Sequence, residues 1–401
     1  MRILKENHEG ISTFLAMALI PLSGFATDIY LPSLPTMAQS LHVSTAAVQL
    51  SLVLFMFCTG FSQLFIGAIL DSFGRFRISL VSLAIFSIAS FVIALFPTIH
   101  LIYIMRVLQG IAIAFIVVGK RAYFVDLYTG DKLKSYISLF AIIWACAPIM
   151  APFIGGYLQK IFNWQSNFYF LGIISLSFLI LELVYSGESL KYHQPFKIRS
   201  IVNTYLNMTR SPDFTLALVM VGTCFGIVVI YSLSSPFIIE KILGYSAVVT
   251  GYSSLLSGLS LMTGGIIAKR IITKPLVRKV TIALIIQATV VLMMICIAPL
   301  VSNIFTLICF TVCIHICGGF IFNVIYGYCL SRFTKNAGVS SGIAGGAMYM
   351  ISSLFSYGFA NLFAVTNQLL LGIANASMII LLIILFACFV KAKNALRVSN
   401  P

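Results

Sequence analysis

Residues 67–77 read Gly67-Ala68-Ile69-Leu70-Asp71-Ser72-Phe73-Gly74-Arg75-Phe76-Arg77 and lie between two long apolar runs, residues 46–70 and 78–97. Each run is close to the length of about 20 residues that a helix needs to cross a bilayer. Gly67 permits close helix approach, and Gly74 permits a tight turn with unusual backbone angles. Asp71 can accept hydrogen bonds at the neck of this turn. The stretch therefore predicts a short polar turn between two membrane-spanning helices.

The composition of the whole chain points the same way. Of its 401 residues, 60% are hydrophobic and only 9% are charged, whereas roughly a quarter are charged in a soluble domain. So few charged side chains cannot cover a water-exposed surface. The nine cysteines lie mostly in apolar runs, and we interpret them, Cys313 and Cys317 included, as packing thiols rather than a disulfide framework or metal site. We predict a polytopic, all-α membrane protein.

Hydropathy and helix-breaking residues predict twelve spans in two halves of six. The longest polar stretch, from Ser186 to Pro212, follows the sixth span. It gives a predicted N-terminal half at 1–186, a linker at 187–212 and a C-terminal half at 213–401. Such a division is expected of a transporter built from related halves. The predicted spans are 11–33, 46–70, 78–97, 99–123, 135–158, 165–186, 213–236, 247–268, 279–298, 302–328, 340–363 and 368–390.

The cations predict the orientation of these spans. The net charge is +15, and 22 of the 25 Lys and Arg residues fall on one predicted side, among them Arg2, Lys191, Lys197 and Lys335. Only Arg106, Lys160 and Lys241 fall elsewhere. By the positive-inside rule, both termini and the linker are cytoplasmic. The positive charge is therefore a topology signal and needs no nucleic acid as partner.

The spacing G-x(3)-D-x(2)-G-R-x-R of residues 67–77 resembles the signature loop of the major facilitator superfamily. The resemblance implies the major facilitator fold, with this loop as a gate between the halves on the cytoplasmic side. It places Gly67, Asp71, Gly74 and Arg75 in that gate. The cytoplasmic end of the fourth span adds Arg121 and Asp126, although Val125 stands where the related pattern R-A-x-x-R-D has its second arginine.

Four further stretches narrow the resemblance within that superfamily. Arg106-Val107-Leu108-Gln109-Gly110 is similar to the R-x-x-Q-G signature of proton-coupled members. Residues 147–156, "APIMAPFIGG", are similar to the helix 5 antiporter signature, with Pro148, Pro152, Gly155 and Gly156 as its key residues and Ala151 where glycine is usual. The stretch "TDIYLPSLP" from Thr27, together with "YSLSSPFIIEKILGYS" from Tyr231, resembles the Bcr/CflA drug:proton antiporters. A kinked packing helix without a role in transport direction is the alternative interpretation of residues 147–156.

Asp28 and Arg106 are the two charges that lie well inside predicted spans. A charge at the bilayer centre costs about 2.5–3.5 kcal/mol on insertion scales. At a helical rise of about 1.5 Å per residue, Asp28 lies about 7 Å and Arg106 about 10 Å from the same external side. Three interpretations remain open: a fixed ion pair, an aspartate that carries the proton and alternates with a cationic substrate, or an interfacial Asp28 at the periplasmic rim. Glu182, near the cytoplasmic end of the sixth span, is interpreted as an interfacial group.

We expect a proton-coupled exporter of a small amphipathic compound in the bacterial inner membrane. It would be a monomer and not an enzyme, bind only substrate, protons and lipid, and need no cofactor because the proton gradient drives it. The alternatives are a transporter of a dedicated metabolite or siderophore, in either direction, and a non-transporting receptor or assembly factor. Other polar residues expected in the cavity helices are Tyr30, Gln109, Tyr231, His315, Asn323 and Tyr326.

Overall fold

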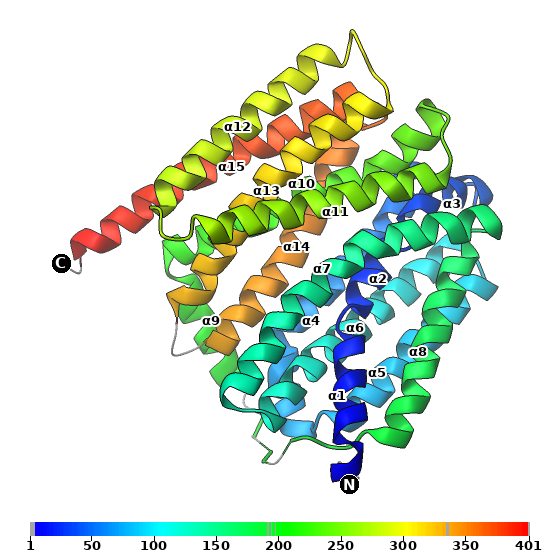
Figure 1. Ribbon diagram of the computed structural model, residues 1–401, viewed down its shortest axis with the longest axis vertical. Coiled ribbons are helices and arrows are strands. Elements are labelled where there is room, and N and C mark those ends of the chain that lie inside the picture. Colours follow the sequence, from blue (N-terminus) through cyan, green and yellow to red (C-terminus); the bar gives the residue numbers. More distant parts are fainter. Residues whose placement is uncertain (1–4, 191, 194, 197, 334–336, 400–401) are drawn as a thin grey trace. The chain divides into compact units, whose positions relative to one another are not determined.

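The computed structural model describes residues 5–190, 192–193, 195–196, 198–333 and 337–399. Among these residues no strand occurs, so the predicted all-α fold is confirmed (Figure 1). The chain divides into two compact units, residues 1–201 and 202–401. Of the cations used for orientation, Arg2, Lys191, Lys197 and Lys335 lie outside the described residues. The division at residue 201 falls within the predicted linker.

The first unit holds a broken helix followed by five long ones. Its helices are α1 (Glu9–Leu19), α2 (Leu22–Asp28), α3 (Leu34–Ser40), α4 (Thr45–Phe73), α5 (Phe76–Leu95), α6 (Ile99–Leu127), α7 (Gly130–Ile161) and α8 (Gln165–Tyr185). Helix α4 packs along α6, and α5 packs against both α6 and α8.

The first predicted span is interrupted. Pro21 separates α1 from α2, and a 3-10 turn (Leu31–Ser33) separates α2 from α3. Because proline lacks an N–H, it ends one helical segment and is tolerated in the first turn of the next. Pro32 and Pro35 occupy such first-turn positions. The predicted end of this span at residue 33 is therefore wrong, because helical structure resumes and runs to Ser40.

The second unit contains the remaining long helices. Helix α9 (Ile198–Thr209) crosses the division between the units, and α10 (Pro212–Phe237) is followed by a π-helical turn (Ile238–Ile242). Helix α10 packs against α13, α14 and α15, and α11 packs along α13. Buried Ile, Leu, Val and Met side chains from α10, α12, α13 and α15 form one core cluster. The other helices are α11 (Ala247–Arg270), α12 (Leu276–Ile297), α13 (Ile304–Arg332), α14 (Ala337–Leu362) and α15 (Gln368–Ser399).

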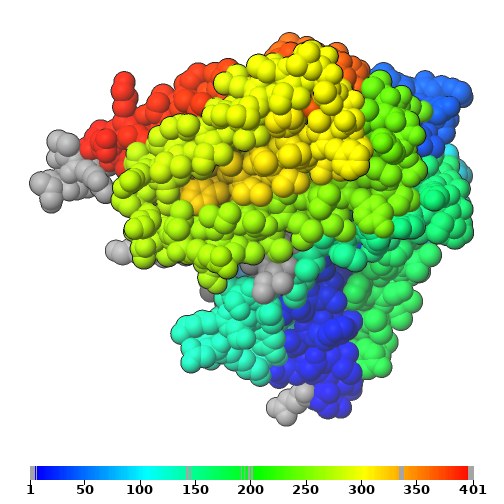
Figure 2. Space-filling model, turned by 45° about the horizontal axis from the view of Figure 1, so that its top comes forward, coloured from blue at the N-terminus to red at the C-terminus, as the bar shows by residue number. Residues whose placement is uncertain are grey.

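Each of the twelve predicted spans overlaps one of these helical segments. Within the described residues, nine segments are long and apolar enough to cross a membrane. Helices α7, α11 and α14 are not among the nine, so the count of twelve spans stays a prediction. Large apolar side chains also face outward. On α12, which lies at the surface of its unit (yellow-green in Figure 2), Ile285 is 61% exposed and Leu292 is 60% exposed. Such a surface suits lipid, and the chain is a multi-pass membrane protein.

Candidate functional site

A buried guanidinium marks the centre of the first unit. Arg106 on α6 is 0% exposed, and its Nη1 and Nη2 each donate a hydrogen bond to the Ala26 carbonyl oxygen at 3.1 Å. This carbonyl lies in the last turn of α2, where the end of the helix leaves acceptors without an intrahelical partner. The guanidinium carbon also lies 4.6 Å from the centre of the Tyr30 ring and 4.1 Å from that of Phe55. Cation–π attraction therefore offsets part of the cost of burying the charge.

The predicted R-x-x-Q-G motif adds two hydrogen bonds that connect Arg106 to α5. Arg106 Nη1 donates to Gln109 Oε1 at 3.0 Å, and Gln109 Nε2 donates to Ser90 Oγ on α5 at 2.8 Å. The i,i+3 spacing puts Arg106 and Gln109 on one helix face. A Cβ on Gly110 would lie 2.5 Å from the Phe55 carbonyl oxygen, so only glycine lets α6 approach α4 this closely. The motif thus joins α2, α4, α5 and α6.

Asp28 is the last residue of α2 and is partly buried. In the described part of the chain, its carboxylate forms no ion pair with Arg106. The guanidinium instead binds the backbone two residues earlier. The fixed Asp28–Arg106 pair that the sequence left open is therefore not formed in this conformation.

Tyr30 and Gln109 were predicted as cavity residues, but both are fully buried within this unit. The Tyr30 hydroxyl lies 3.2 Å from Ser51 Oγ, and its ring packs against Phe168. In this conformation the two side chains support the helix break and the buried guanidinium.

The predicted antiporter motif, residues 147–156, lies in α7 and packs on the same break in the first span. Pro148 and Pro152 lie inside α7 without ending it. A Cβ on Gly155 would lie 1.6 Å from the Ile29 carbonyl oxygen, which excludes any other residue at this contact. Gly156, next along α7, is also buried. Residues 26–30 are thus contacted from α6 by a guanidinium and from α7 by a glycine.

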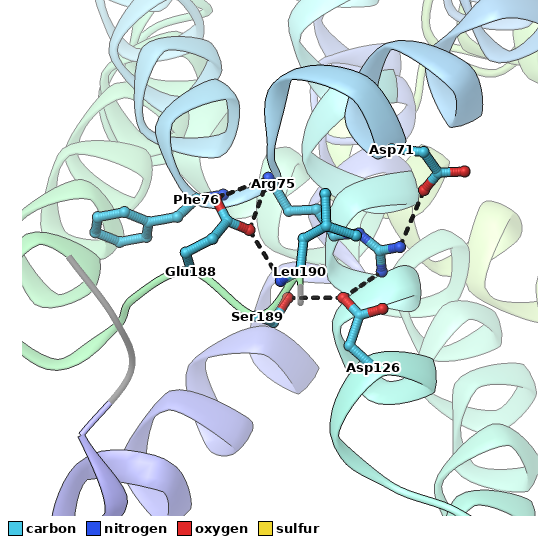
Figure 3. A network of polar contacts seen from close by, with 7 residues as sticks. All are labelled: Asp71, Arg75, Phe76, Asp126, Glu188, Ser189 and Leu190. Carbon is cyan, nitrogen blue, oxygen red and sulfur yellow. Dashed lines mark hydrogen bonds and ion pairs between the residues drawn. The ribbon is translucent and has the colours of Figure 1, made fainter. Parts of the chain in front are cut away.

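The predicted gate residues form a polar network at the turn between α4 and α5 (Figure 3). Arg75 Nη2 lies 3.0 Å from Asp71 Oδ1, and Arg75 Nη1 lies 2.6 Å from Asp126 Oδ2 on α6. Ser189 Oγ donates to the same Asp126 oxygen at 2.8 Å. Gly74 has φ of 89°, in the left-handed region that glycine tolerates.

Two of the predicted gate residues have other surroundings. Within the described chain, nothing lies within 4 Å of a Cβ built on Gly67, so this conformation shows no close approach there. Arg121 is exposed and makes no ion pair with the described carboxylates. It therefore lies outside the network drawn in Figure 3.

Glu188, which the sequence did not single out, completes the network. Its two carboxylate oxygens accept hydrogen bonds from the backbone N–H of Arg75 at 3.0 and 3.1 Å, and Oε2 accepts one from Phe76 at 3.1 Å. These N–H groups begin α5, where a helix lacks backbone acceptors and favours negative charge. Glu188 therefore caps α5 from 113 residues away, and a local sequence pattern gives no signal for it.

Glu182 was predicted to be an interfacial group near the cytoplasmic end of the sixth span, and it is buried within the first unit. Its side chain is 0% exposed and its Oε2 lies 2.5 Å from Nζ of Lys120, whose side chain is 7% exposed. The pair joins α6 to α8 beside a small polar cavity lined by Ser12, Ser79 and Lys120 among others. Helix α6 brings Lys120 inward because it is one helical turn before Tyr123 and Phe124, which are buried on the same side.

The second unit places the other predicted cavity residues in two groups. The Tyr231 hydroxyl is hydrogen-bonded to Ser253, and the Tyr231 ring meets His315 edge to face with centroids 5.4 Å apart. His315 Nδ1 lies 2.8 Å from Ser257 Oγ, so α10, α11 and α13 share one buried polar cluster. Farther along α13, Asn323 is exposed and Tyr326 stacks on Phe322. The structure thus brings Tyr231 and His315 together, but not Asn323 or Tyr326.

A helical membrane protein with two units, a buried arginine contact at a broken first helix and a charged turn after the second span is built as a secondary transporter. The sequence model described as Major Facilitator Superfamily matches residues 16–357. The chain belongs to this family, as the signature loop predicted.

Relatives from bacteria give the same result. The chain is 29% identical over 352 residues to the uncharacterized MFS-type transporter YdgK of Bacillus subtilis, covering 86% of this chain and 87% of that one. It is 27% identical to multidrug resistance protein MdtL of Shigella dysenteriae, covering 94% and 96%. It is 29% identical to a bicyclomycin resistance protein homolog of Haemophilus influenzae, but over only 51% of each chain. The predicted resemblance to drug-resistance transporters is confirmed.

Solved structures share the fold. A peptide transporter POT superposes with a TM-score of 0.74 at 11% identity, covering 96% of this chain and 95% of that one. A D-xylose-proton symporter superposes with a TM-score of 0.70 at 13% identity, covering 92% and 96%. At these identities the likeness shows the major facilitator fold alone.

Proposed function

We propose that this transporter exports a small amphipathic compound across the bacterial inner membrane in exchange for protons. The proton gradient would drive the exchange by alternating access, without ATP, cofactor or enzymatic step. Both termini would be cytoplasmic and the working unit a monomer. The relatives named for multidrug and bicyclomycin resistance support the class of substrate. The motif around Arg106 supports the coupling to protons.

The observation that carries the proposal is the arrangement at Asp28. Its carboxylate is partly buried at a helix break, while the neighbouring guanidinium binds the Ala26 carbonyl instead of the carboxylate. Burial favours the neutral acid, and a nearby cation favours the carboxylate. Because Arg106 keeps its own contacts, Asp28 can gain or lose a proton without breaking them. One carboxylate can then bind a proton or a cationic substrate in turn, which makes the exchange obligatory.

The network at Arg75 would serve as the cytoplasmic gate. Arg75 is held by Asp71 on α4 and by Asp126 on α6, so these helices move together while the ion pairs persist. The antiporter motif at residues 147–156 would keep α7 in register with the broken first helix, because only a glycine at residue 155 can lie this close to the Ile29 carbonyl oxygen. A movement of residues 26–30 caused by proton binding at Asp28 would thereby be transmitted to both α6 and α7, because both helices contact these residues.

Reconstituted protein in liposomes with an imposed pH gradient tests the proposal. Flux of a panel of cationic and neutral amphipathic compounds, together with metabolites and siderophores, is measured in both directions for wild type, Asp28→Asn and Asp131→Asn. Asp131 is a matched control because its side chain is 97% exposed and pairs only with Lys134 among the described residues. We expect Asp28→Asn to abolish proton-driven flux and Asp131→Asn to preserve it.

The outcomes separate the alternatives. Full proton-driven export by Asp28→Asn contradicts the role of that carboxylate. Flux restricted to one metabolite or siderophore, or directed inward, replaces drug export with dedicated transport. No flux of any compound by wild-type protein, together with binding of a partner protein, favours the non-transporting receptor or assembly factor.

A further inference from the structure

The surface of the first unit carries an apolar groove between α5 and α6. These two helices pack against each other (Figure 1). The groove has a cavity volume of about 290 Å³. The α5 residues of the groove recur at spacings of three and four, so their side chains lie on one helix face. The apolar residues that form its two sides are Ile78, Val81 and Ile85 on α5, and Leu108, Ile111, Ala112 and Phe115 on α6.

Arg77 lies at one end of this groove. It is the second residue of α5 and is exposed. The nearby carboxylates are already used, because Arg75 pairs with Asp71 and Asp126 and Glu188 caps the start of α5. In the part of the chain that the structure describes, Arg77 makes no ion pair. Its guanidinium is therefore available to an anion from outside the protein.

The groove has the length of one membrane leaflet. From Arg77 to Ile85 is eight residues, or about 12 Å along the helix. Half of a hydrocarbon core of about 30 Å is about 15 Å. Arg77 follows directly on the turn that begins α5, where a lipid headgroup would lie, and the apolar walls extend from it into the depth of the span. The spacing of charge and apolar surface thus matches the headgroup and acyl chain of one lipid.

We propose that this groove binds a phospholipid with an anionic headgroup from the surrounding bilayer. One acyl chain would lie between α5 and α6, and the phosphate would bind the Arg77 guanidinium. The planar guanidinium fork suits phosphate oxygens, and basic pockets between membrane helices are known to hold anionic headgroups. The site is separate from Asp28 and does not depend on the direction or substrate of transport.

Native mass spectrometry of the full-length protein in detergent tests the proposal. Dioleoylphosphatidylglycerol and dioleoylphosphatidylethanolamine are titrated separately against wild type, Arg77→Ala and Val81→Trp. Arg270→Ala is the control for loss of one exposed charge at a helix end, and Ile285→Trp is the control for an added indole on the exposed surface of another helix, α12. Val81 is 58% exposed and Ile285 is 61% exposed, so neither substitution alters the protein interior.

We expect Arg77→Ala to weaken phosphatidylglycerol binding about fivefold, the effect of one basic side chain near a membrane surface. Phosphatidylethanolamine binding should weaken less, because the ammonium of that zwitterionic headgroup offsets the charge of its phosphate. Val81→Trp should weaken both lipids by blocking the groove, and Ile285→Trp should weaken neither. Equal losses for Arg77→Ala and Arg270→Ala, or for the two tryptophan variants, would overturn the site. If the mass spectra contain a dimer, and the dimeric fraction falls only with Val81→Trp, the groove would be an interface with a second copy of the chain. That result would also overturn the lipid site.

Discussion

The buried pair between Lys120 and Glu182 gives the sharpest prediction about stability. Replacing Lys120 with Met keeps a side chain of similar length and removes the charge. Glu182 would then lose its partner, because its other oxygen, Oε1, is buried without a hydrogen bond among the described residues. Glu182→Met leaves Lys120 unpaired in the same way. Each single change should therefore be strongly destabilising.

The magnitude follows from the burial of the two side chains. Removing one partner of a buried ion pair costs about 3–5 kcal/mol, because an unpaired charge stays in a medium of low dielectric constant. The cavity beside Lys120 has a volume of only about 10 Å³ and has room for at most one water molecule, so the expected loss for each single change stays at about 3–5 kcal/mol. Replacing both residues with Met removes both charges, and an apolar pair of similar volume is often neutral or stabilising.

The assay is equilibrium unfolding in mixed micelles with increasing sodium dodecyl sulfate. Trp164 reports on the first unit, since it is buried and its Nε1 donates to Ser40 Oγ. The chain has two tryptophans, so a Trp144→Phe background isolates this signal. The exposed pair of Lys134 and Asp131, with side chains 79% and 97% exposed, is the control and should show almost no change.

The double-mutant cycle decides the outcome. We expect a large favourable coupling energy, with the double variant close to wild type. Single variants that lose less than about 1 kcal/mol, in the range of surface pairs, or a double variant that loses the sum of both singles, would refute the reasoning that this pair is buried and mutually dependent.

Two further predictions concern helix contacts in the first unit. Gly155→Ala should abolish transport and lower the unfolding midpoint, because its Cβ would lie 1.6 Å from the Ile29 carbonyl oxygen. Gly67→Ala should fold normally, because no described atom lies within 4 Å of a Cβ at that residue. Equal behaviour of the two variants in unfolding and flux assays would contradict this prediction. Glu188→Ala should remove the cap of α5, lower stability by about 1–2 kcal/mol and speed hydrogen exchange of the Arg75 and Phe76 amides, while Asp131→Ala should not change exchange there. Unchanged exchange in Glu188→Ala would show that the carboxylate does not protect these amides.

Features set by neighbouring residues were predictable. Apolar runs near 20 residues gave the positions of the helices, because a membrane helix must satisfy its own backbone and bury its side chains in lipid. Gly74 was expected to adopt unusual backbone angles, and it has positive φ. The extent of the first span was harder to predict, because Pro32 and Pro35 can either end a helix or begin one.

The partners of the charged groups were not predictable. Lys120 and Glu182 are 62 residues apart, Arg106 and Ala26 are 80 apart, and Arg75 and Glu188 are 113 apart. Depth along the helices made Asp28 a reasonable partner for Arg106, but depth does not give the direction in which a side chain points. A free backbone carbonyl also carries no signal in a sequence, because every residue has one.

The sequence by itself therefore determined the membrane class, the helix positions and the family, since these follow from hydropathy and from motifs within about ten residues. Only the tertiary structure decided which group holds each buried charge. A charge in an apolar interior must bind whatever acceptor the packing brings within about 3 Å. For Arg106 that acceptor is the Ala26 carbonyl, exposed by the end of α2, rather than the aspartate two residues later.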